Sequence, residues 1–438
     1  MKKVICVFSL SLLTFYNSFV LYDYEIEDLY FLMPNYLLTI YLLLAIFVPS
    51  KYDFSFNDVF YVFYFFFFGV APVFQYLEGV NIWGGVAFTL EDYILTTYVS
   101  LFAIVLYTIL NRFFRKIVRQ KRKDYGQLVL SNRVRINPWM LLLISFISFC
   151  VYFASIDFNI FKLLIRGGDE IESGTNLSTS SYLIVSKFIR PMSVASLILF
   201  KVCKCKNRIV EILLWIITLL ANCPFGMARF SVAAFYIPLL FLYSRWIKGK
   251  YNFSIFLIFS ILIIFPFLNQ FRYFGDSDIK LGLDFDMFLA GHFDSFQMFM
   301  RVLKENIITY GNQLLGVIFF FMPRSLWPDK PIGSGHFVAG ESDLYFDNIS
   351  MNFFGEGYLN FGFLGVFLFV IVIAYFNAYM DVRFWENKNN NRFVVYYYLL
   401  LGMEFVILRG QLMSFYPIAV GYVLSAYIVY RLSIRNIH

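Results

Sequence analysis

The chain contains little charge. Asp, Glu, Lys and Arg make up only 15% of its 438 residues, whereas 60% are hydrophobic. A soluble domain of average composition carries about a quarter charged residues, so the composition excludes an ordinary water-soluble fold. In a bilayer every backbone polar group must be satisfied inside the protein, and long apolar segments achieve this as helices. The sequence therefore predicts an all-α polytopic membrane protein.

Cysteine and histidine are scarce too, with five and three copies. The cysteines do not follow the pattern of a disulfide framework. Cys203 and Cys205 form a Cys-x-Cys pair, but no second pair completes a metal site. Two Asp-x-Asp pairs lie between residues 276 and 286, and this motif is too short to be specific. We therefore expect no metal and no cofactor.

Several motifs of soluble enzymes are absent. The sequence contains no Walker A motif, no Rossmann glycine fingerprint and no Gly-x-Ser-x-Gly elbow. The formal net charge is +7, but the basic residues cluster in short segments between apolar runs. This distribution is not typical of a nucleic-acid-binding surface, so no nucleic-acid partner is expected.

About twelve apolar runs approach the roughly 20 helical residues that a bilayer crossing needs. We place them at 4–22, 29–49, 57–77, 92–111, 138–158, 181–200, 209–224, 229–246, 253–269, 353–380, 393–410 and 412–430. These runs divide the chain into an N-terminal membrane domain of about nine helices (1–269), a long polar segment (270–352) and a C-terminal membrane domain of about three helices (353–438).

The orientation follows from the distribution of Lys and Arg. The segment from Asn111 to Asn137 is rich in both, so the positive-inside rule places it in the cytoplasm. Alternation from there puts both termini in the cytoplasm and residues 270–352 on the outer face. Most acidic residues, Asp23 and Glu25 among them, then fall outside as well. This topology places the long polar segment on the outer side of the membrane.

The long outer segment holds an unusual loop at its centre. Met322–His336 contains three prolines, which fix the backbone, and two glycines, which allow tight bends. Arg324 and Lys330 lie inside this stiffened frame. A rigid, cationic loop beside a membrane predicts a site for an anionic, lipid-linked substrate.

Two short elements are expected to flank this loop at the membrane surface. Asp294 and Gln297 form a capping pattern, and apolar residues follow at helical spacing up to Ile307. We interpret this stretch as an amphipathic helix lying on the bilayer surface. Leu314–Met322 is apolar but too short to span, so we interpret it as a re-entrant or interfacial segment.

Three arginines are candidates for phosphate binding on the outer side: Arg229, Arg272 and Arg324. A guanidinium group binds phosphate oxygens in a bidentate fork and stays charged. Arg229 opens an expected span, where the amides of a helix N-terminus add to an anion site. The alternative for each arginine is a snorkelling side chain that contacts lipid headgroups.

Four ionisable residues fall within apolar spans, where such groups are costly and face a cavity or a partner. They are Lys187, Arg190, Glu404 and Arg409. Glu404 and Arg409 are five residues apart, about 140° around a helix, and are poorly placed to pair. An ion pair between Glu404 and Arg190 and a role toward substrate are the two interpretations.

Five stretches together resemble a known family. They are Asn222–Phe230, Phe265–Arg272, Gly291–Asp294, Pro323–Pro331 and Gly355–Gly362. With them the chain resembles the bacterial O-antigen and oligosaccharide repeat-unit polymerases of the Wzy type. The Pro-Arg-x-x-Trp-Pro-x-Lys-Pro cluster is the most specific. Arg324 and Gly335 meet the family's Arg-x10-Gly pattern, but a second copy in another outer loop is absent.

The resemblance implies a metal-independent membrane glycosyltransferase. It implies transfer of a growing glycan from undecaprenyl diphosphate to the distal sugar of an incoming lipid-linked repeat unit. The diphosphate clamp is then Arg324, Arg272 and Arg229, with Lys330 in support. His292, Asp294 or Glu356 serves as the base for the acceptor hydroxyl. The remaining expected substrate-binding residues are Trp327, Gly335, His336 and Arg409.

The expected partners are the undecaprenyl-diphosphate-linked oligosaccharide, the lipid bilayer and a chain-length regulator protein. Three other functions remain open. An O-antigen ligase shares the donor, and a scaffold of envelope assembly needs no catalysis. A flippase or other transporter would place polar residues along a central path and show two related halves. The concentration of polar residues in one outer segment favours an enzyme over a transporter.

Overall fold

The computed structural model describes residues 25–48, 51–125, 136–164, 179–225, 227, 229–249, 251–266, 285–386 and 391–434. These residues form helices, and their single isolated β-bridge joins Ile136 and Ile434. The all-α prediction is therefore confirmed for the described chain. The predicted first span, 4–22, lies outside these residues.

Within the described chain, eight helical segments are long and apolar enough to cross a membrane. Five correspond to single helices or to a 3-10 turn with its helix: η1 (Ile26–Asp28) with α2 (Leu29–Phe47), α6 (Pro138–Ser155), α18 (Asn391–Arg409), α19 (Leu412–Ser433) and the long α17 (Phe353–Glu386). The others are α5 (Leu90–Tyr125), α3 (Phe56–Tyr64) with η2 (Phe65–Val70) and α4 (Ala71–Leu77), and α8 (Thr179–Ile184) with η3 (Val185–Ile189) and α9 (Pro191–Val202). This arrangement fits a multi-pass membrane protein.

The predicted seventh to ninth spans are shorter helices. They are α10 (Arg208–Ala221), α11 (Arg229–Tyr243) and α12 (Asn252–Phe259), which continues into η5 (Ser260–Ile264). The remaining short elements are α7 (Ile160–Leu164), η4 (Trp246–Lys248), η6 (Phe285–Leu289), η7 (Gly291–Phe293), α14 (Ser295–Lys304), α15 (Asn312–Ile318) and α16 (Ser334–Glu341). Of the twelve predicted spans, the described chain therefore contains eight as full-length helical segments and three as shorter helices.

Local sequence explains where several helices begin. Ser55, Asn137 and Asn207 each precede a helix and accept a hydrogen bond from a backbone N–H of its first turn. Such caps satisfy amides that have no partner within the helix. Pro138 then occupies the first position of α6, where its missing N–H costs nothing.

Helix α17 contains a break near its start. Phe361 and Gly362 have non-helical backbone angles, and Gly362 has a φ of +62°. A residue without Cβ adopts this conformation at little steric cost. The break separates the first turns of α17, which contain Glu356, from the long apolar remainder of the helix.

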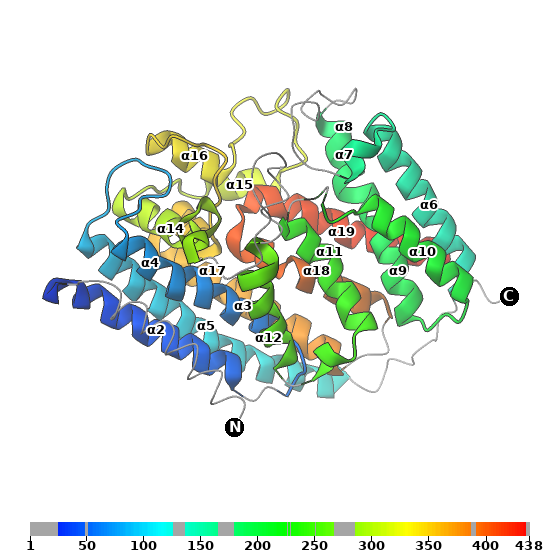
Figure 1. The fold of residues 1–438 in the computed structure, drawn as a ribbon, viewed down its shortest axis with the longest axis horizontal. Coiled ribbons are helices and arrows are strands. Elements are labelled where there is room, and N and C mark those ends of the chain that lie inside the picture. The colour runs from blue at the N-terminus through cyan, green and yellow to red at the C-terminus, as the bar shows by residue number, and fades with distance from the viewer. Residues whose placement is uncertain are drawn as a thin grey trace.

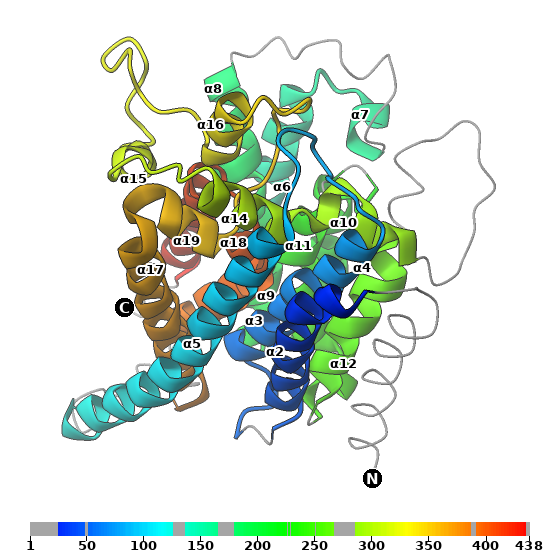
Figure 2. The same ribbon diagram turned by 90° about the vertical axis from the view of Figure 1, so that its left-hand side faces the viewer.

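The helices pack into one bundle (Figure 1). Helix α5 lies along α17 and α2, α11 along α18, and α6 along α9 and α10. Figure 2 shows α15 and α16 at one end of the bundle and the last turns of α5 at the opposite end. The basic segment after Asn111 and the Pro-rich loop therefore lie at opposite ends, as predicted for opposite sides of a membrane.

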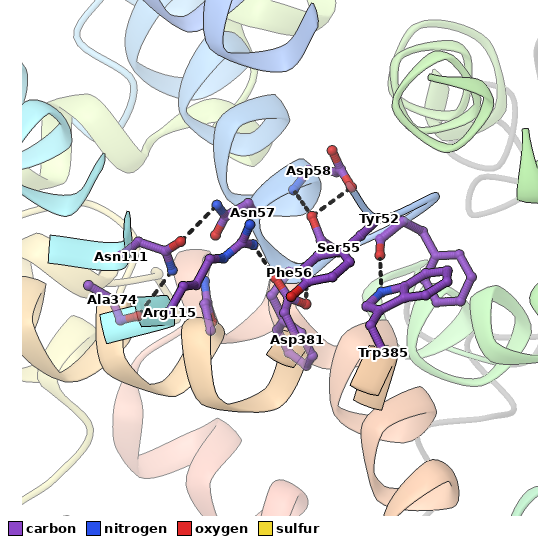
Figure 3. Close-up of polar contacts among 12 residues, drawn as sticks. Tyr52, Ser55, Phe56, Asn57, Asp58, Asn111, Arg115, Ala374, Asp381 and Trp385 are labelled. Atoms are coloured by element: carbon purple, nitrogen blue, oxygen red, sulfur yellow. Dashed lines mark hydrogen bonds and ion pairs between the residues drawn. The ribbon is translucent and has the colours of Figure 1, made fainter. Parts of the chain in front are cut away.

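A buried polar network holds the helices together in the C-terminal part of α5 (Figure 3). Arg115 of α5 pairs with Asp381 of α17 at 2.6 Å. Asp381 also accepts hydrogen bonds from the Phe56 amide and the Tyr397 hydroxyl, each at 3.0 Å. Residues of four helices thus meet at one carboxylate.

This network corrects one prediction. Asn111 was expected to begin a loop, but α5 continues as a helix to Tyr125. Arg115 and Arg119 lie on this extension and pair with Asp381 and Glu386 of α17. The extension is stabilised by these partners, which lie more than 260 residues away in the sequence and could not be recognised from local hydropathy.

Helix α14 corrects another prediction. It begins at Ser295 as expected, but its residues from Ser295 to Leu303 are buried within the protein instead of lying on the bilayer surface. Gln297 accepts a hydrogen bond from the Ile82 amide and donates one to the Val80 carbonyl. The capping pattern is not used, because the Asp294 side chain makes no cap hydrogen bond. The polar face of α14 is covered by the segment between α4 and α5.

Candidate functional site

The junction between α18 and α19 connects five of the eleven predicted site residues. Arg409 ends α18, and Leu412 begins α19. The Arg409 guanidinium donates to the carbonyls of His292, at 2.9 Å, and Gly291, at 3.1 Å. It also forms an ion pair with Asp294 at 3.1 Å. Arg409 therefore fixes the segment before α14 to the end of α18.

Asp294 is fully buried and bound on both carboxylate oxygens. One oxygen accepts from Arg409 and, at 2.7 Å, from Ser350, and the other accepts from the Trp83 indole N–H at 2.9 Å. Its side chain has no exposed surface. This geometry suits a carboxylate that holds three segments together, and it leaves little access for an acceptor sugar.

Glu356 and Gln411 form the second half of the junction. The Glu356 carboxylate accepts hydrogen bonds from the Ser334 hydroxyl and, at 2.8 Å, from the Leu412 amide. Gln411 accepts from the Gly335 amide at 2.9 Å. The first turns of α16, α17 and α19 are joined by these contacts, and Glu356 itself is buried.

Gly335 occupies a position without room for a side chain. A Cβ built on this residue would lie 2.1 Å from the carbonyl oxygen of Ile349. The glycine of the Arg-x10-Gly pattern thus permits close packing of α16 against the segment that precedes α17. The contact gives Gly335 a structural reason to be glycine, whether or not substrate passes near it.

The Pro-rich loop is folded by its own side chains. Arg324 donates to the Lys330 carbonyl at 2.9 Å. Lys330 donates from its amine to the carbonyls of Phe320, at 2.6 Å, and Met322, at 3.0 Å. Burial of this amine, with Arg324 beside it, lowers the pKa of Lys330. The two cations thus close the loop through hydrogen bonds to its own carbonyls.

Arg324 keeps donors available after closing the loop. Its hydrogen bonds to the described residues use Nη1 alone, and the side chain is exposed. Trp327 is half-buried in the same loop. The other two guanidinium nitrogens, Nε and Nη2, therefore make no hydrogen bond to the described residues.

Exposed apolar side chains surround the approach to this loop. They are Leu315, Ile318, Phe319 and Phe321. Helix α15 covers only the first part of the predicted Leu314–Met322 segment, and turns follow it. Such a band of exposed apolar groups beside an arginine fits the predicted interfacial segment, with the arginine at the depth of lipid headgroups.

The other predicted residues lie in different environments. His292 is partly exposed, and its ring packs edge-on against Phe265 with 5.6 Å between centroids. His336 lies 3.3 Å from Asp347, and both are exposed. Helix α11 begins at Arg229, as predicted. Arg272 lies outside the described residues.

Glu404 and Arg190, which the sequence suggested as an ion pair, have other partners in the structure. Glu404 accepts from Asn377 at 3.0 Å. Arg190 donates to the Ala221 carbonyl at 2.7 Å and lies 4.3 Å from the centre of the Tyr152 ring. Glu404 and Arg190 are thus held in separate contacts, Glu404 of α18 with α17, and Arg190 with residues of α10 and α6.

Sequence analysis missed Gln411 and Arg301. Arg301 of α14 is almost fully buried and donates to the carbonyls of Val86, at 2.6 Å, and Gly84, at 2.8 Å. Arg301 lies on the polar face of this amphipathic stretch, so nothing in the sequence indicated that it would be buried. Gln411 carries no signal at all, since its importance depends on the approach of α16.

Comparisons of the chain with protein-family models, with curated proteins and with solved structures find no match.

Proposed function

We propose that the chain is a membrane glycosyltransferase that polymerises lipid-linked oligosaccharide repeat units on the outer face of the bacterial cytoplasmic membrane. The growing glycan leaves undecaprenyl diphosphate and joins the distal sugar of an incoming lipid-linked unit. The proposal is supported by the motif resemblance, by the membrane-spanning helices and by the geometry of the Pro-rich loop.

The observation that carries the proposal is the fixed, exposed guanidinium of Arg324. Its loop is closed by hydrogen bonds to the Lys330 carbonyl and from the Lys330 amine. The neighbouring exposed apolar side chains suit the headgroup layer of a bilayer. A preorganised cation stabilises a diphosphate leaving group without reorganising as charge develops. Arg324 is therefore assigned to the diphosphate, with Lys330 shaping its loop.

In the proposed reaction an acceptor hydroxyl attacks the anomeric carbon of the donor glycan. The bond from that carbon to the diphosphate oxygen breaks, and undecaprenyl diphosphate leaves with the electron pair. The hydroxyl proton passes to a base. Asp294 and Glu356 are buried and hydrogen-bonded, whereas His292 is partly exposed. We assign the base to His292 and give Asp294 and Glu356 the task of positioning the surrounding segments.

The first test is the glycan made by a strain that lacks this protein and any second polymerase. Loss of a polymerase leaves single repeat units on the final acceptor. Loss of a ligase leaves long chains on the lipid carrier, and loss of a flippase leaves repeat units inside the cell. Normal chain lengths in the deletion strain would rule out the proposed reaction.

The second test separates charge from geometry at Arg324. Loss of one preorganised charge-stabilising group costs on the order of 10²–10³ in rate, so Arg324→Ala should abolish visible polymer. Arg324→Lys keeps the charge but loses the bidentate fork, and should lose most activity. The measurement is the glycan ladder at matched protein levels.

Arg392→Ala is the control for this test, because Arg392 is also an exposed arginine but lies near the start of α18, outside the Pro-rich loop. It should leave the ladder unchanged. A full ladder from Arg324→Ala would remove Arg324 from the mechanism. A full ladder from Arg324→Lys alone would reduce its role to simple charge attraction.

A further inference from the structure

A cavity of about 210 Å³ lies among the apolar helices of the bundle. Helix α11 packs on α18, and α12 packs on α3. The cavity lies between these two pairs and is lined by side chains from all four helices and from η5. Val59, Ile237, Phe256 and Phe405 are wall residues from α3, α11, α12 and α18.

The cavity is lined almost entirely by apolar side chains. Among the lining residues only Tyr236 and Ser260 carry a polar side-chain atom. The Tyr236 hydroxyl donates to the Asn222 carbonyl, and the Ser260 hydroxyl donates to the Phe256 carbonyl at 2.7 Å. An ordered water needs two to four polar partners. The cavity therefore suits hydrocarbon and not water or a polar ligand.

One wall is a π-helical turn. Element η5 continues α12 with a wider turn, and Ser260, Ile261 and Ile264 of this turn line the cavity. π-Helical turns inside helices occur frequently at functional sites. The turn also carries the chain toward Phe265, the next lining residue.

Several lining residues of the cavity are partly exposed, and one of them contacts a residue of the candidate site. Val232, Ala233 and Phe256 line it and are partly exposed. On helices of this composition the exterior is the hydrocarbon of the bilayer. Phe265 lines the cavity on another side and packs against the His292 ring. A chain entering from the bilayer would thus point toward the proposed base.

We propose that this cavity binds part of the polyprenyl chain of the lipid-linked substrate, with the diphosphate end directed toward Phe265 and His292. The choice of polyprenyl over other hydrocarbon rests on the proposed function, because that reaction supplies a polyprenyl diphosphate. A cavity of about 150 Å³ holds one benzene molecule. By this comparison the cavity holds about one or two isoprene units, and the rest of the chain stays in the bilayer.

The test uses photo-crosslinking to the full-length protein in lipid nanodiscs. One probe is a polyprenyl phosphate with a diazirine in its first isoprene units, and the other is a phosphatidylethanolamine with a diazirine in an acyl chain. We expect the polyprenyl probe to label residues 232–240 and 256–265, with loss of labelling under excess unlabelled polyprenyl phosphate. Polyprenyl adducts that lie elsewhere would overturn the assignment, as would equal labelling of these residues by the phospholipid.

A filling variant sharpens the test. Ala233→Phe places a ring in the cavity, so labelling of residues 256–265 should be lost. Ala154→Phe makes the same change at an exposed position of α6 and should keep the labelling. Undiminished labelling in Ala233→Phe would contradict the proposal. If this variant does not fold, the competition experiment with the unchanged protein still decides.

The glycan ladder of the deletion strain distinguishes this inference from the proposed function. Polyprenyl labelling of the cavity together with normal chain lengths would keep the cavity assignment and reject the polymerase. Shortened glycan together with labelling elsewhere would keep the polymerase and reject the cavity assignment.

Discussion

At Gly335, the backbone of α16 lies directly against the segment before α17. A methyl group there would meet the Ile349 carbonyl oxygen at 2.1 Å, so the backbone must shift to accept it. Overpacking of this kind costs about 1–3 kcal/mol. We expect Gly335→Ala to lower the melting temperature of the protein in detergent. The melting temperature is measured by fluorescence-detected size-exclusion chromatography of heated samples.

Gly340 provides the matched control within the same helix. A Cβ at Gly340 meets nothing within 4 Å, and alanine favours a helix over glycine by about 0.5–1 kcal/mol. Gly340→Ala should therefore keep or slightly raise the melting temperature. Equal melting temperatures for the two variants would show that α16 is not held tightly against Ile349.

A second prediction at the residue scale concerns Arg409. Its partner Asp294 has no exposed surface, so Arg409→Leu leaves a buried carboxylate without its cation. Breaking such a pair costs about 3–5 kcal/mol. We expect a large loss of thermal stability, and partial recovery when Asp294→Asn is added to the same chain.

Lys201→Ala is the control for Arg409→Leu. Lys201 pairs with Glu211 at 2.7 Å, but both side chains are partly exposed, at 36% and 24%. Exposed pairs contribute about 0–1 kcal/mol, so this variant should melt close to the unchanged protein. No recovery in the double variant of Arg409 and Asp294 would show that the ion pair is not what holds the junction.

At the scale of elements, α14 and α15 show how two neighbouring apolar segments reach different environments. Helix α14 is covered on all sides, because the segment between α4 and α5 binds its polar face through Gln297 and Arg301. Within the part of the chain that the structure describes, Leu315 and Ile318 of α15 are exposed. Burial of one helix and exposure of the other follow from long-range partners and not from their own apolar content.

The exposure of α15 predicts its depth in the membrane. A nitroxide spin label at position 321, where Phe321 is exposed, should collide with oxygen more than with a water-soluble nickel complex. A label at position 345, where Tyr345 is exposed in the loop after α16, should show the reverse. Both labels need a background in which the five native cysteines are replaced. If the label at position 321 collided more with the nickel complex than with oxygen, the predicted interfacial location of the Leu314–Met322 segment would be contradicted.

At the scale of the whole molecule, the two ends of the bundle differ in charge and in architecture. The last turns of α5 carry Arg115 and Arg119, and α15 and α16 lie at the other end (Figure 2). Because basic segments stay in the cytoplasm, we expect the Pro-rich loop to face outward.

Cysteine labelling tests this orientation. A cysteine at Ser325 should react with an impermeant thiol reagent in intact spheroplasts, whereas a cysteine at Lys121 should react only after the membrane is opened. Ser325 is exposed in the described loop, so a lack of reaction there would not follow from burial. Labelling at position 121 alone would reverse the orientation and move the proposed site to the cytoplasmic face.

The sequence was sufficient to predict the class of fold and most of the membrane helices. A span such as 412–430 is recognised from about 20 consecutive apolar residues, which is a local property, and α19 covers it at Leu412–Ser433. The start of α11 at Arg229 was predicted for the same reason. The start of α14 at Ser295 was predicted from a capping pattern that the structure does not use. The stiffness of the Pro-rich loop, which follows from the restriction that proline places on the backbone, stays a prediction.

Tertiary structure alone decided which polar residues have accessible side chains. Asp294 was a candidate base in the sequence, but Trp83, Ser350 and Arg409 converge on it from distant segments. Gln411 had no sequence signal, yet it binds the Gly335 amide, 76 residues away in the chain. Composition and periodicity report the environment that each segment prefers, whereas a buried hydrogen bond depends on which other segments approach. For this protein the membrane helices belong to the first category, and the α18–α19 junction belongs to the second.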